Sequence, residues 1–211
     1  MYYPKLFSES DPAVIDAFIR AHGFATLVTA RDGVPESSHV PLELVHATDG
    51  TRVLEGHFAR ANGQWRHLEA GAPVLAIFAG PHAYVSSSWY ADENVPTWNY
   101  MVVHAWGTAR LVNDEGEVRD MLRRLSRHYE PGGAFDVDRL TPGFYAKEVR
   151  GIVAFTIRVE RLAAKFKLSQ NRNEADHANV VRRLRERPDD DSRGIAEAMA
   201  ARHRQRFSSD I

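Results

Sequence analysis

Short runs of alternating apolar and polar residues recur along this chain, and turn-forming residues separate them. Phe24–Ala30 alternates in this way before Arg31-Asp32-Gly33, and Val53–Phe58 follows an Asp49-Gly50 pair. Period-two alternation is typical of a strand with one buried face, and Asp-Gly is a common hairpin turn. Strands of this length need neighbours to be stable, so the pattern predicts an antiparallel sheet built from several hairpins.

The other elements follow from the same kind of signal. Asp11 as N-cap and Pro12 in the first turn predict a helix over Ala13–Ala21. Further strands are expected at Ser38–Val45, Val74–Ala79, Ala83–Ser86, Tyr100–Leu111 and Ile152–Val159, with Gly80-Pro81 breaking the chain between the second and the third. Further helices are expected at Asn62–Glu69, at Glu115–Tyr129, within Val137–Val149 with an interruption at Pro142-Gly143, and in two pieces after Glu174 that Pro188–Asp191 separates. This order predicts a mainly β fold, an antiparallel barrel decorated by helices with a helical C-terminal extension.

The composition restricts the chemistry that the protein can use. Of 211 residues, 44% are hydrophobic and 26% charged, which is typical of a globular protein with a substantial core. The absence of cysteine excludes disulfides, zinc–thiolate sites, cysteine-ligated iron–sulfur clusters and thiol nucleophiles. No apolar run approaches the ~20 residues of a membrane-spanning helix, and the N-terminus lacks the basic and then apolar pattern of a signal peptide. We therefore expect a cytoplasmic protein with no membrane partner.

Charge is distributed unevenly along the chain, although the net charge is only −1. Residues 1–160 carry 15 Lys or Arg against 20 Asp or Glu, whereas residues 161–211 carry 12 against 8. We expect a barrel domain over residues 1–165 and a helical tail over residues 166–211, packed on the barrel or on a partner subunit. Two solvated helices would account for the basic tail. If the protein binds DNA, the expected contacts are Arg182, Arg183, Arg185 and Arg187, because the sequence has no helix-turn-helix pattern.

Two stretches within the predicted sheet carry residues that a barrel does not need. Pro41, in His39-Val-Pro41, cannot donate to a sheet ladder, so it indicates a strand edge, a bulge or a backbone that faces a ligand. The stretch Gly56–Trp65 runs from a strand end into a predicted helix, where free N–H groups attract anions. Within it, Arg60 adds a permanently charged fork that suits phosphate, and Asn62 can cap the helix or donate to the same ligand. A surface arginine beside an ordinary helix cap is the alternative.

Two further stretches combine aromatic, polar and basic side chains. In Tyr84–Tyr90 and Val95–Tyr100, aromatic residues alternate with small polar ones, which suits either a planar heteroaromatic ligand or a dimer interface. Lys165–Arg172, with the sequence KFKLSQNR, follows the last predicted strand and combines cations with amide donors. Such a segment can fold back on an anionic ligand or on another subunit, and a basic surface loop is the alternative.

The motifs of common catalytic and metal sites are missing from the sequence. None of the ten histidines has the HExxH or HxH spacing of a metal site, so no metal site is predicted. His39, His57 and His104 lie on predicted strands, where structural histidines are common. Neither a Gly-x-Ser-x-Gly elbow nor a Gly-x-Gly-x-x-Gly loop is present. A hydrolase triad and a Rossmann dinucleotide site therefore have no motif support, and no catalytic residue is assigned.

Taken together, the stretches MYYPKLF, HVPLEL, GHFARANGQW, YVSSSWY, VPTWNY and KFKLSQNR resemble the PaiB family of FMN-binding negative transcriptional regulators. The resemblance runs from Met1 to about Leu184 and departs from the family pattern at Gly63 and Ser87, where proline is common. It implies a split β-barrel with antiparallel, Greek-key-like strands, related to the pyridoxamine-phosphate oxidase-like flavoproteins. It also implies a homodimer with FMN bound at the subunit interface.

The resemblance assigns candidate cofactor contacts position by position. The phosphate of FMN would lie against Arg60, Ala61 and Asn62. The isoalloxazine ring would be flanked by His39, Val40, Pro41 and Leu42, with Gly56, His57 and Phe58 behind it. The partner subunit would contribute Trp98, Asn99 and Tyr100, and further contacts would come from Lys167, Ser169 and Gln170.

Three functions are open on this basis. The first is an FMN-binding dimer with a regulatory role. The second is a flavin-dependent reductase or oxidase for a small molecule, in which the cofactor carries the electron chemistry, and His39 or Tyr100 could serve there as an acid or base if close to the ring. The third is a haem-binding split barrel, which would most simply use a histidine ligand.

Overall fold

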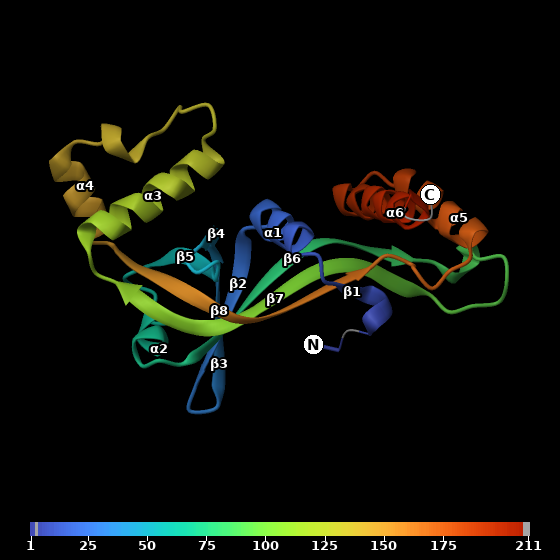
Figure 1. Ribbon diagram of the computed structural model, residues 1–211, viewed down its shortest axis with the longest axis horizontal. Coiled ribbons are helices and arrows are strands. Elements are labelled where there is room, and N and C mark those ends of the chain that lie inside the picture. The colour runs from blue at the N-terminus through green and yellow to red at the C-terminus, as the bar shows by residue number, and fades with distance from the viewer. Residues whose placement is uncertain (3, 209–211) are drawn as a thin grey trace. The chain divides into compact units, whose positions relative to one another are not determined.

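Eight strands form one mostly antiparallel sheet in the computed structural model, which describes residues 1–2 and 4–208, with side chains as far as residue 202. The strands are β1 (Ser8–Glu9), β2 (Phe24–Arg31), β3 (Val34–Pro41), β4 (Glu43–His46), β5 (Arg52–Ala59), β6 (Pro73–Val85), β7 (Thr97–Val112) and β8 (Ile152–Lys167). Their order across the sheet is β3-β2-β6-β7-β8-β5-β4, and β1 pairs with β8 (Figure 1). The sheet of the described chain is open because this path ends in β3 and β4, which is the arrangement of a split barrel.

The helices connect these strands or follow the last of them. They are α1 (Pro12–Ala21), α2 (Trp65–Glu69), α3 (Glu115–Tyr129), α4 (Pro142–Val149), α5 (Glu174–Arg185) and α6 (Asp190–Ser208). Sequence signals account for their first turns: Asp11 Oδ1 accepts from the Ala13 N–H at 2.8 Å, and Asp114 Oδ1 accepts from the Glu117 N–H at 2.8 Å. Across the described residues, every helix is too short or too polar to cross a bilayer.

The chain divides into two compact units, and the three longest strands contribute residues to both. The helical unit comprises residues 1–18, 79–103 and 163 onward, and the hairpin unit comprises residues 19–78 and 104–162. In the helical unit α5 packs on α6, and Leu184, Ile195 and Met199 are fully buried (Figure 1). In the hairpin unit the core centres on Phe58 and Phe155, whose ring centroids are 5.0 Å apart.

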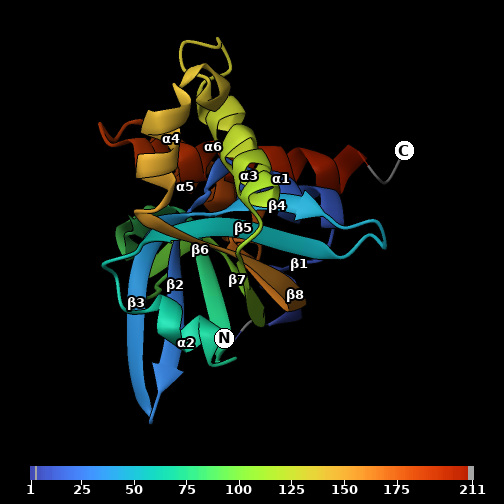
Figure 2. The same cartoon turned by 90° about the vertical axis from the view of Figure 1, so that its left-hand side faces the viewer.

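Two acidic residues face each other across β4 and β5 in the hairpin unit. Glu43 and Glu55 are partners in the strand register, and burial raises the pKa of the Glu43 carboxyl. Arg124 Nε and Nη2 donate to the two oxygens of Glu55 at 2.7 and 2.8 Å, and His128 Nδ1 lies 2.9 Å from Glu43 Oε2. Like charges opposed in a sheet are destabilising, so these two side chains of α3 compensate the pair and hold the helix against β4 and β5 (Figure 2).

The predicted strands are present in the structure, but several of them begin or end at other residues than expected. The strand expected over Ser38–Val45 is in fact parts of two strands, β3, which begins earlier at Val34, and β4. They are separated at Leu42, whose N–H donates to Gly23 O at 2.8 Å. Gly80-Pro81 does not interrupt β6, and β7 begins three residues before the expected Tyr100. The largest error concerns β8, which continues from the expected end at Val159 to Lys167. The added residues of β8 pair with β1, which lies far away in the sequence. The residues around Lys165 therefore carry no local sequence signal that the strand continues.

The helix predictions fare similarly. The helix over Glu115–Tyr129 is confirmed to the residue. The separation of the tail into α5 and α6 is also confirmed, although α6 begins at Asp190, inside the expected break of Pro188–Asp191. Pro142-Gly143 was expected to interrupt a helix and instead begins α4, since proline suits the first helical position. The expected division between barrel and tail at residue 165 stays a prediction.

Candidate functional site

Arg60 is held on several sides by the chain itself, at the point where β5 ends in the hairpin unit. Its backbone N–H donates to Gly151 O at 2.7 Å, and the Trp65 indole Nε1 donates to Arg60 O at 3.1 Å. The guanidinium Nε and Nη2 donate to Arg150 O and Ile152 O, both at 2.7 Å. The side chain is therefore fixed in one orientation before any ligand arrives.

The same guanidinium keeps donors for a ligand. Arginine has five N–H donors, and in the described chain Arg60 uses one on Nε and one on Nη2. The residue is exposed, so Nη1 and the second Nη2 hydrogen can reach an anion from solvent. A planar, permanently charged fork that is already oriented suits the oxygens of a phosphate group.

The residues after Arg60 form a turn that two side-chain amides anchor. Asn62 Oδ1 accepts from the Gln64 N–H at 3.0 Å, and Asn62 Nδ2 donates to Ser38 Oγ on β3 at 2.8 Å. The Gln64 side chain is fully buried, and its Nε2 lies 3.1 Å from each of three acceptors: Leu27 O, Thr29 Oγ1 and Glu36 O. This carboxamide therefore attaches the Arg60 turn to both β2 and β3, beside α2 (Figure 2).

The prediction of a helix from Asn62 is wrong, because α2 begins only at Trp65 with Gln64 at the N-cap position. Asn62 instead closes a side-chain turn with Gln64, and the helix begins one residue after that turn. Sequence reasoning also missed Gln64 as a functional residue. It lies inside the GHFARANGQW stretch, but a buried glutamine leaves no signal of its own.

The end of β3 lies against β5, next to the Arg60 turn. Pro41 pairs with Phe24 at the end of the outermost strand, so the interpretation of this proline as an edge residue is confirmed. A Cβ on Gly56 would come within 2.6 Å of Leu42 Cδ2, 3.0 Å of Phe155 Cζ and 3.2 Å of Pro41 O. The missing side chain of Gly56 leaves room for this approach, which places Pro41 and Leu42 beside the strand that leads to Arg60.

The other candidate ring contacts in the hairpin unit differ in accessibility. His39 is exposed and lies on β3 one residue from Ser38, which bonds to Asn62. Val40 and Phe58 are buried in the core, so they shape the site from behind. Burial lowers the pKa of His57, which keeps its imidazole neutral at neutral pH. Ala61 is exposed at the tip of the turn.

The remaining candidates lie in the helical unit and fall into two groups. Trp98 is 52% exposed and Tyr100 partly exposed on β7. Asn99 between them is fully buried, and its Nδ2 lies 2.8 Å from Ser169 Oγ and 3.4 Å from Met199 Sδ. Gln170 Nε2 donates to Phe166 O at 2.5 Å, so Asn99, Ser169 and Gln170 hold the chain together here. Their role as cofactor contacts stays a prediction.

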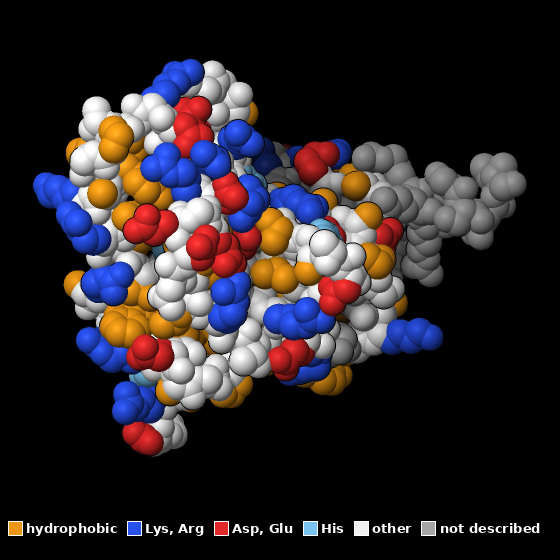
Figure 3. All heavy atoms as spheres, turned by 60° about the vertical axis from the view of Figure 1, so that its left-hand side comes forward, with side chains coloured by type: hydrophobic (Ala, Val, Ile, Leu, Met, Phe, Trp, Pro, Cys, Tyr) orange, Lys and Arg blue, Asp and Glu red, His pale blue; other side chains and the backbone are white. Residues whose placement is uncertain are grey.

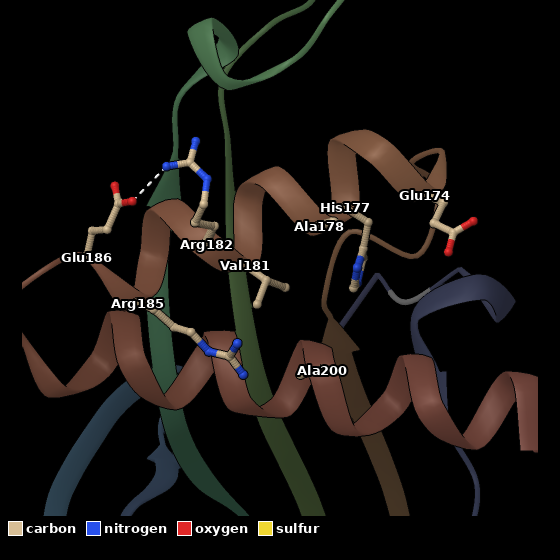
Figure 4. Close-up of a pocket in the computed structure, with 8 residues that line it drawn as sticks. All are labelled: Glu174, His177, Ala178, Val181, Arg182, Arg185, Glu186 and Ala200. Carbon is tan, nitrogen blue, oxygen red and sulfur yellow. Dashed lines mark hydrogen bonds and ion pairs between the residues drawn. The ribbon is translucent and has the colours of Figure 1, made fainter.

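The tail arginines are engaged within the chain. Arg182 Nη1 lies 2.7 Å from Glu186 and Arg185 Nε 2.9 Å from Glu197, and Figure 4 shows Arg182 pointing at Glu186. Arg187 Nη1 donates to Tyr84 O at 3.0 Å. On the face drawn in Figure 3, acidic and basic side chains are interspersed, and no extended basic area is visible there.

Comparison with known proteins defines the class of the chain. Residues 1–161 match the family model described as "Putative FMN-binding domain", so the chain belongs to that family of FMN-binding proteins. It is 41% identical over 202 residues to "Protease synthase and sporulation protein PAI 2" of Bacillus subtilis (strain 168), which covers 94% of this chain and 96% of that protein. The resemblance to the PaiB family is thereby confirmed.

Solved structures confirm the fold at lower sequence identity. The flavocytochrome Anf3 from Azotobacter vinelandii matches with a TM-score of 0.62 and 20% identity, over 82% of this chain and 75% of that one. The FAD and haem binding protein from Mycobacterium smegmatis matches with a TM-score of 0.61 and 17% identity, over 81% of this chain and 78% of that one. The exposed guanidinium of Arg60, which the carbonyls of Arg150 and Ile152 orient, has the charge and the donor geometry that a phosphate group such as that of FMN requires.

The close approach at Gly56 predicts a clear difference between two glycines of this stretch. Gly56→Ala should lower the free energy of unfolding by about 1–3 kcal/mol, because the new methyl group overpacks the contact with Leu42 and Phe155. Gly63→Ala is the matched control, since a Cβ there meets only Arg66 Nη1 at 3.5 Å. It should leave stability unchanged or raise it by up to about 1 kcal/mol. Urea unfolding of both variants checks this, and equal midpoints would contradict it.

Proposed function

We propose that this protein is a homodimeric regulatory flavoprotein of the PaiB type that anchors the phosphate of FMN on Arg60. The observation that carries the proposal is the guanidinium of Arg60, which two backbone carbonyls orient and which still has free N–H groups facing solvent. Asn62 and Gln64 support it by fixing the turn that follows. Bound FMN would supply reversible electron transfer, which no side chain of this protein provides.

The isoalloxazine ring would lie along the end of β3, from His39 to Pro41, with the buried side chain of Leu42 behind it. β3 is the outermost strand of the path, so its outer edge offers backbone N–H and C=O groups for ring nitrogens and carbonyls. Pro41 removes one of these donors and fixes the local backbone. The neutral imidazole of His57 adds no charge behind the ring.

A comparison of two flavins tests the phosphate contact. Arg60→Ala should weaken FMN binding roughly 10–100-fold, the range expected for the loss of hydrogen bonds to a charged group. Riboflavin lacks the phosphate, so its affinity should be the same in the variant and in the unchanged protein. Fluorescence titration measures both affinities, and Arg66→Ala, another exposed arginine nearby, is the matched control.

The riboflavin measurement separates the role of Arg60 from simple loss of folding. A misfolded variant would lose both flavins. If Arg60→Ala binds FMN as tightly as the unchanged protein does, the phosphate lies elsewhere and the proposed anchor is wrong.

A homodimer is supported by large apolar side chains that are left exposed in both units. Phe24 is 68% exposed and Val34 67% exposed at the two ends of the β2–β3 hairpin, and Trp98 is 52% exposed on β7. Large aromatic residues at a surface are typical of the core of an interface. We propose that a second copy of the chain covers the flavin ring and contributes Trp98 and Tyr100.

Complementation between two inactive variants tests the shared site. If Arg60 and Trp98 of one site come from different subunits, Arg60→Ala and Trp98→Ala should each lose FMN as pure dimers. A mixed dimer should then contain one intact site, so unfolding and refolding the two variants together should restore FMN binding in part. No recovery, in mixtures shown by mass spectrometry to contain mixed dimers, would contradict an intersubunit site.

The regulatory role is proposed from the sequence similarity to the Bacillus subtilis relative, whose name refers to a protease synthase and to sporulation. Direct contact with DNA would use the tail arginines. Their ion pairs on the surface contribute at most about 1 kcal/mol each, so they can exchange carboxylates for phosphates. Deleting the tail is a poor test, since Leu184, Ile195 and Met199 belong to the core of the helical unit.

Point variants provide a better test of DNA contact. Arg182→Ala and Arg183→Ala should each weaken an electrophoretic shift on all sequences alike and reduce the slope against log salt by about 1. Arg127→Ala on α3, also an exposed helical arginine, is the control and should leave the slope unchanged. A shift with the same salt slope in all three variants would show that the tail does not bind DNA.

A further inference from the structure

Two lysines share one face of β8 in the helical unit, because the strand continues to its end at Lys167. Side chains two positions apart on a strand point to the same side, so Lys165 and Lys167 are neighbours. β7 lies beside β8 in the sheet, and it presents Tyr100 next to Lys165 with the ammonium 5.2 Å from the ring centroid. The two cations thus lie beside an aromatic strand.

Lys165 is buried without a carboxylate. The residue is only 7% exposed, its Nζ donates to Tyr2 O at 3.0 Å, and the same Nζ lies 5.5 Å from the ring centroid of Tyr2 and 5.2 Å from that of Tyr100. Among the described residues no acidic side chain forms an ion pair with it. The ammonium of Lys165 thus has one carbonyl and two ring faces as partners, and it has no carboxylate partner among the described residues.

Lys167 adds a second charge to the same place. Its Nζ bonds to Thr97 Oγ1, and in the described chain it too has no acidic partner. Burial and then the neighbouring charges of Lys165 and Arg172 lower the pKa of Lys167. These three cations have no acidic partner in the part of the chain that the structure describes, so they repel one another, and an added anion would relieve that repulsion.

The face of the sheet that carries Tyr100 also carries exposed aromatic rings, which lie farther from the two lysines. Trp98, two positions before Tyr100 on β7, lies 5.9 Å from Tyr84 and 6.0 Å from His82 between ring centroids. Both Trp98 and Tyr84 are exposed, at 52% and 39%. A planar ligand can stack on such rings while its charged end reaches the ammonium groups.

We propose that this face of the helical unit binds a small aromatic carboxylate, with the carboxylate on Lys165 and Lys167 and the ring against Tyr100 and Trp98. The site is formed by a single chain and does not need flavin. In the proposed dimer the same face covers the flavin ring, so an aromatic acid bound here becomes the second ligand of the flavin site.

Benzoate is the probe for this site, and calorimetric titration of flavin-free protein measures its binding. Benzoate should bind, whereas benzamide, which has no charge, and cyclohexanecarboxylate, which has no aromatic ring, should each bind roughly tenfold more weakly or worse. Lys167→Met and Lys165→Met should each reduce benzoate affinity at least tenfold. Lys147→Met, at an exposed lysine of α4, is the matched control and should bind benzoate normally.

Folding of the variants is checked independently. Lys165→Met should raise the urea midpoint, because methionine fills the same space and removes a buried charge. FMN affinity of the same variants separates this proposal from the flavin proposal. Two results would overturn it: benzoate binding that all the lysine variants retain, or a loss in Lys167→Met of FMN affinity alone with benzoate binding unchanged.

Discussion

The buried carboxamide of Gln64 is the interaction on which the candidate flavin site depends. Its Nε2 reaches acceptors on β2 and β3, so the turn that carries Arg60 and Asn62 cannot move without breaking bonds that lie in the core. Thr29 Oγ1 extends the network to His67 Nδ1 at 2.8 Å, which includes α2. Hydrogen bonds shielded from water are costly to lose. Arg60 can therefore be exposed and still keep one orientation.

Much of this arrangement could be predicted from the sequence. The parts that could not be predicted share one cause, which is that they depend on contacts between residues far apart in the sequence. Pro41 indicated a strand edge, and Asp32-Gly33 indicated a hairpin turn, where both residues have the positive φ values of 52° and 78° that the turn requires. These are local signals. Gln64 bonds to residues 28 to 37 positions away, and nothing near it in the sequence reveals that it is buried.

The two faces of β7 could be predicted from the sequence, whereas the end of β8 that carries Lys165 and Lys167 could not. Strand alternation alone separates Asn99 from Trp98 and Tyr100, and the structure places Asn99 in the core. The same rule pairs Lys165 with Lys167, but it could not be applied while the strand was expected to end at Val159. The extension rests on pairing with β1, where Ser8 and Lys165 are partners, and that pairing is a property of the fold.

The opposed carboxylates of Glu43 and Glu55 also limit how this sequence can change over evolutionary time. Replacing Arg124 first would leave the buried carboxylate of Glu55 without its partner and facing Glu43, whereas neutralising Glu55 first would leave only a half-exposed arginine. The order of substitution therefore matters, because replacing Glu55 before Arg124 destabilises the protein less than the reverse order. Related chains should lose or keep positions 55 and 124 together, and positions 43 and 128 likewise, so that aligned relatives would record this contact as paired substitution.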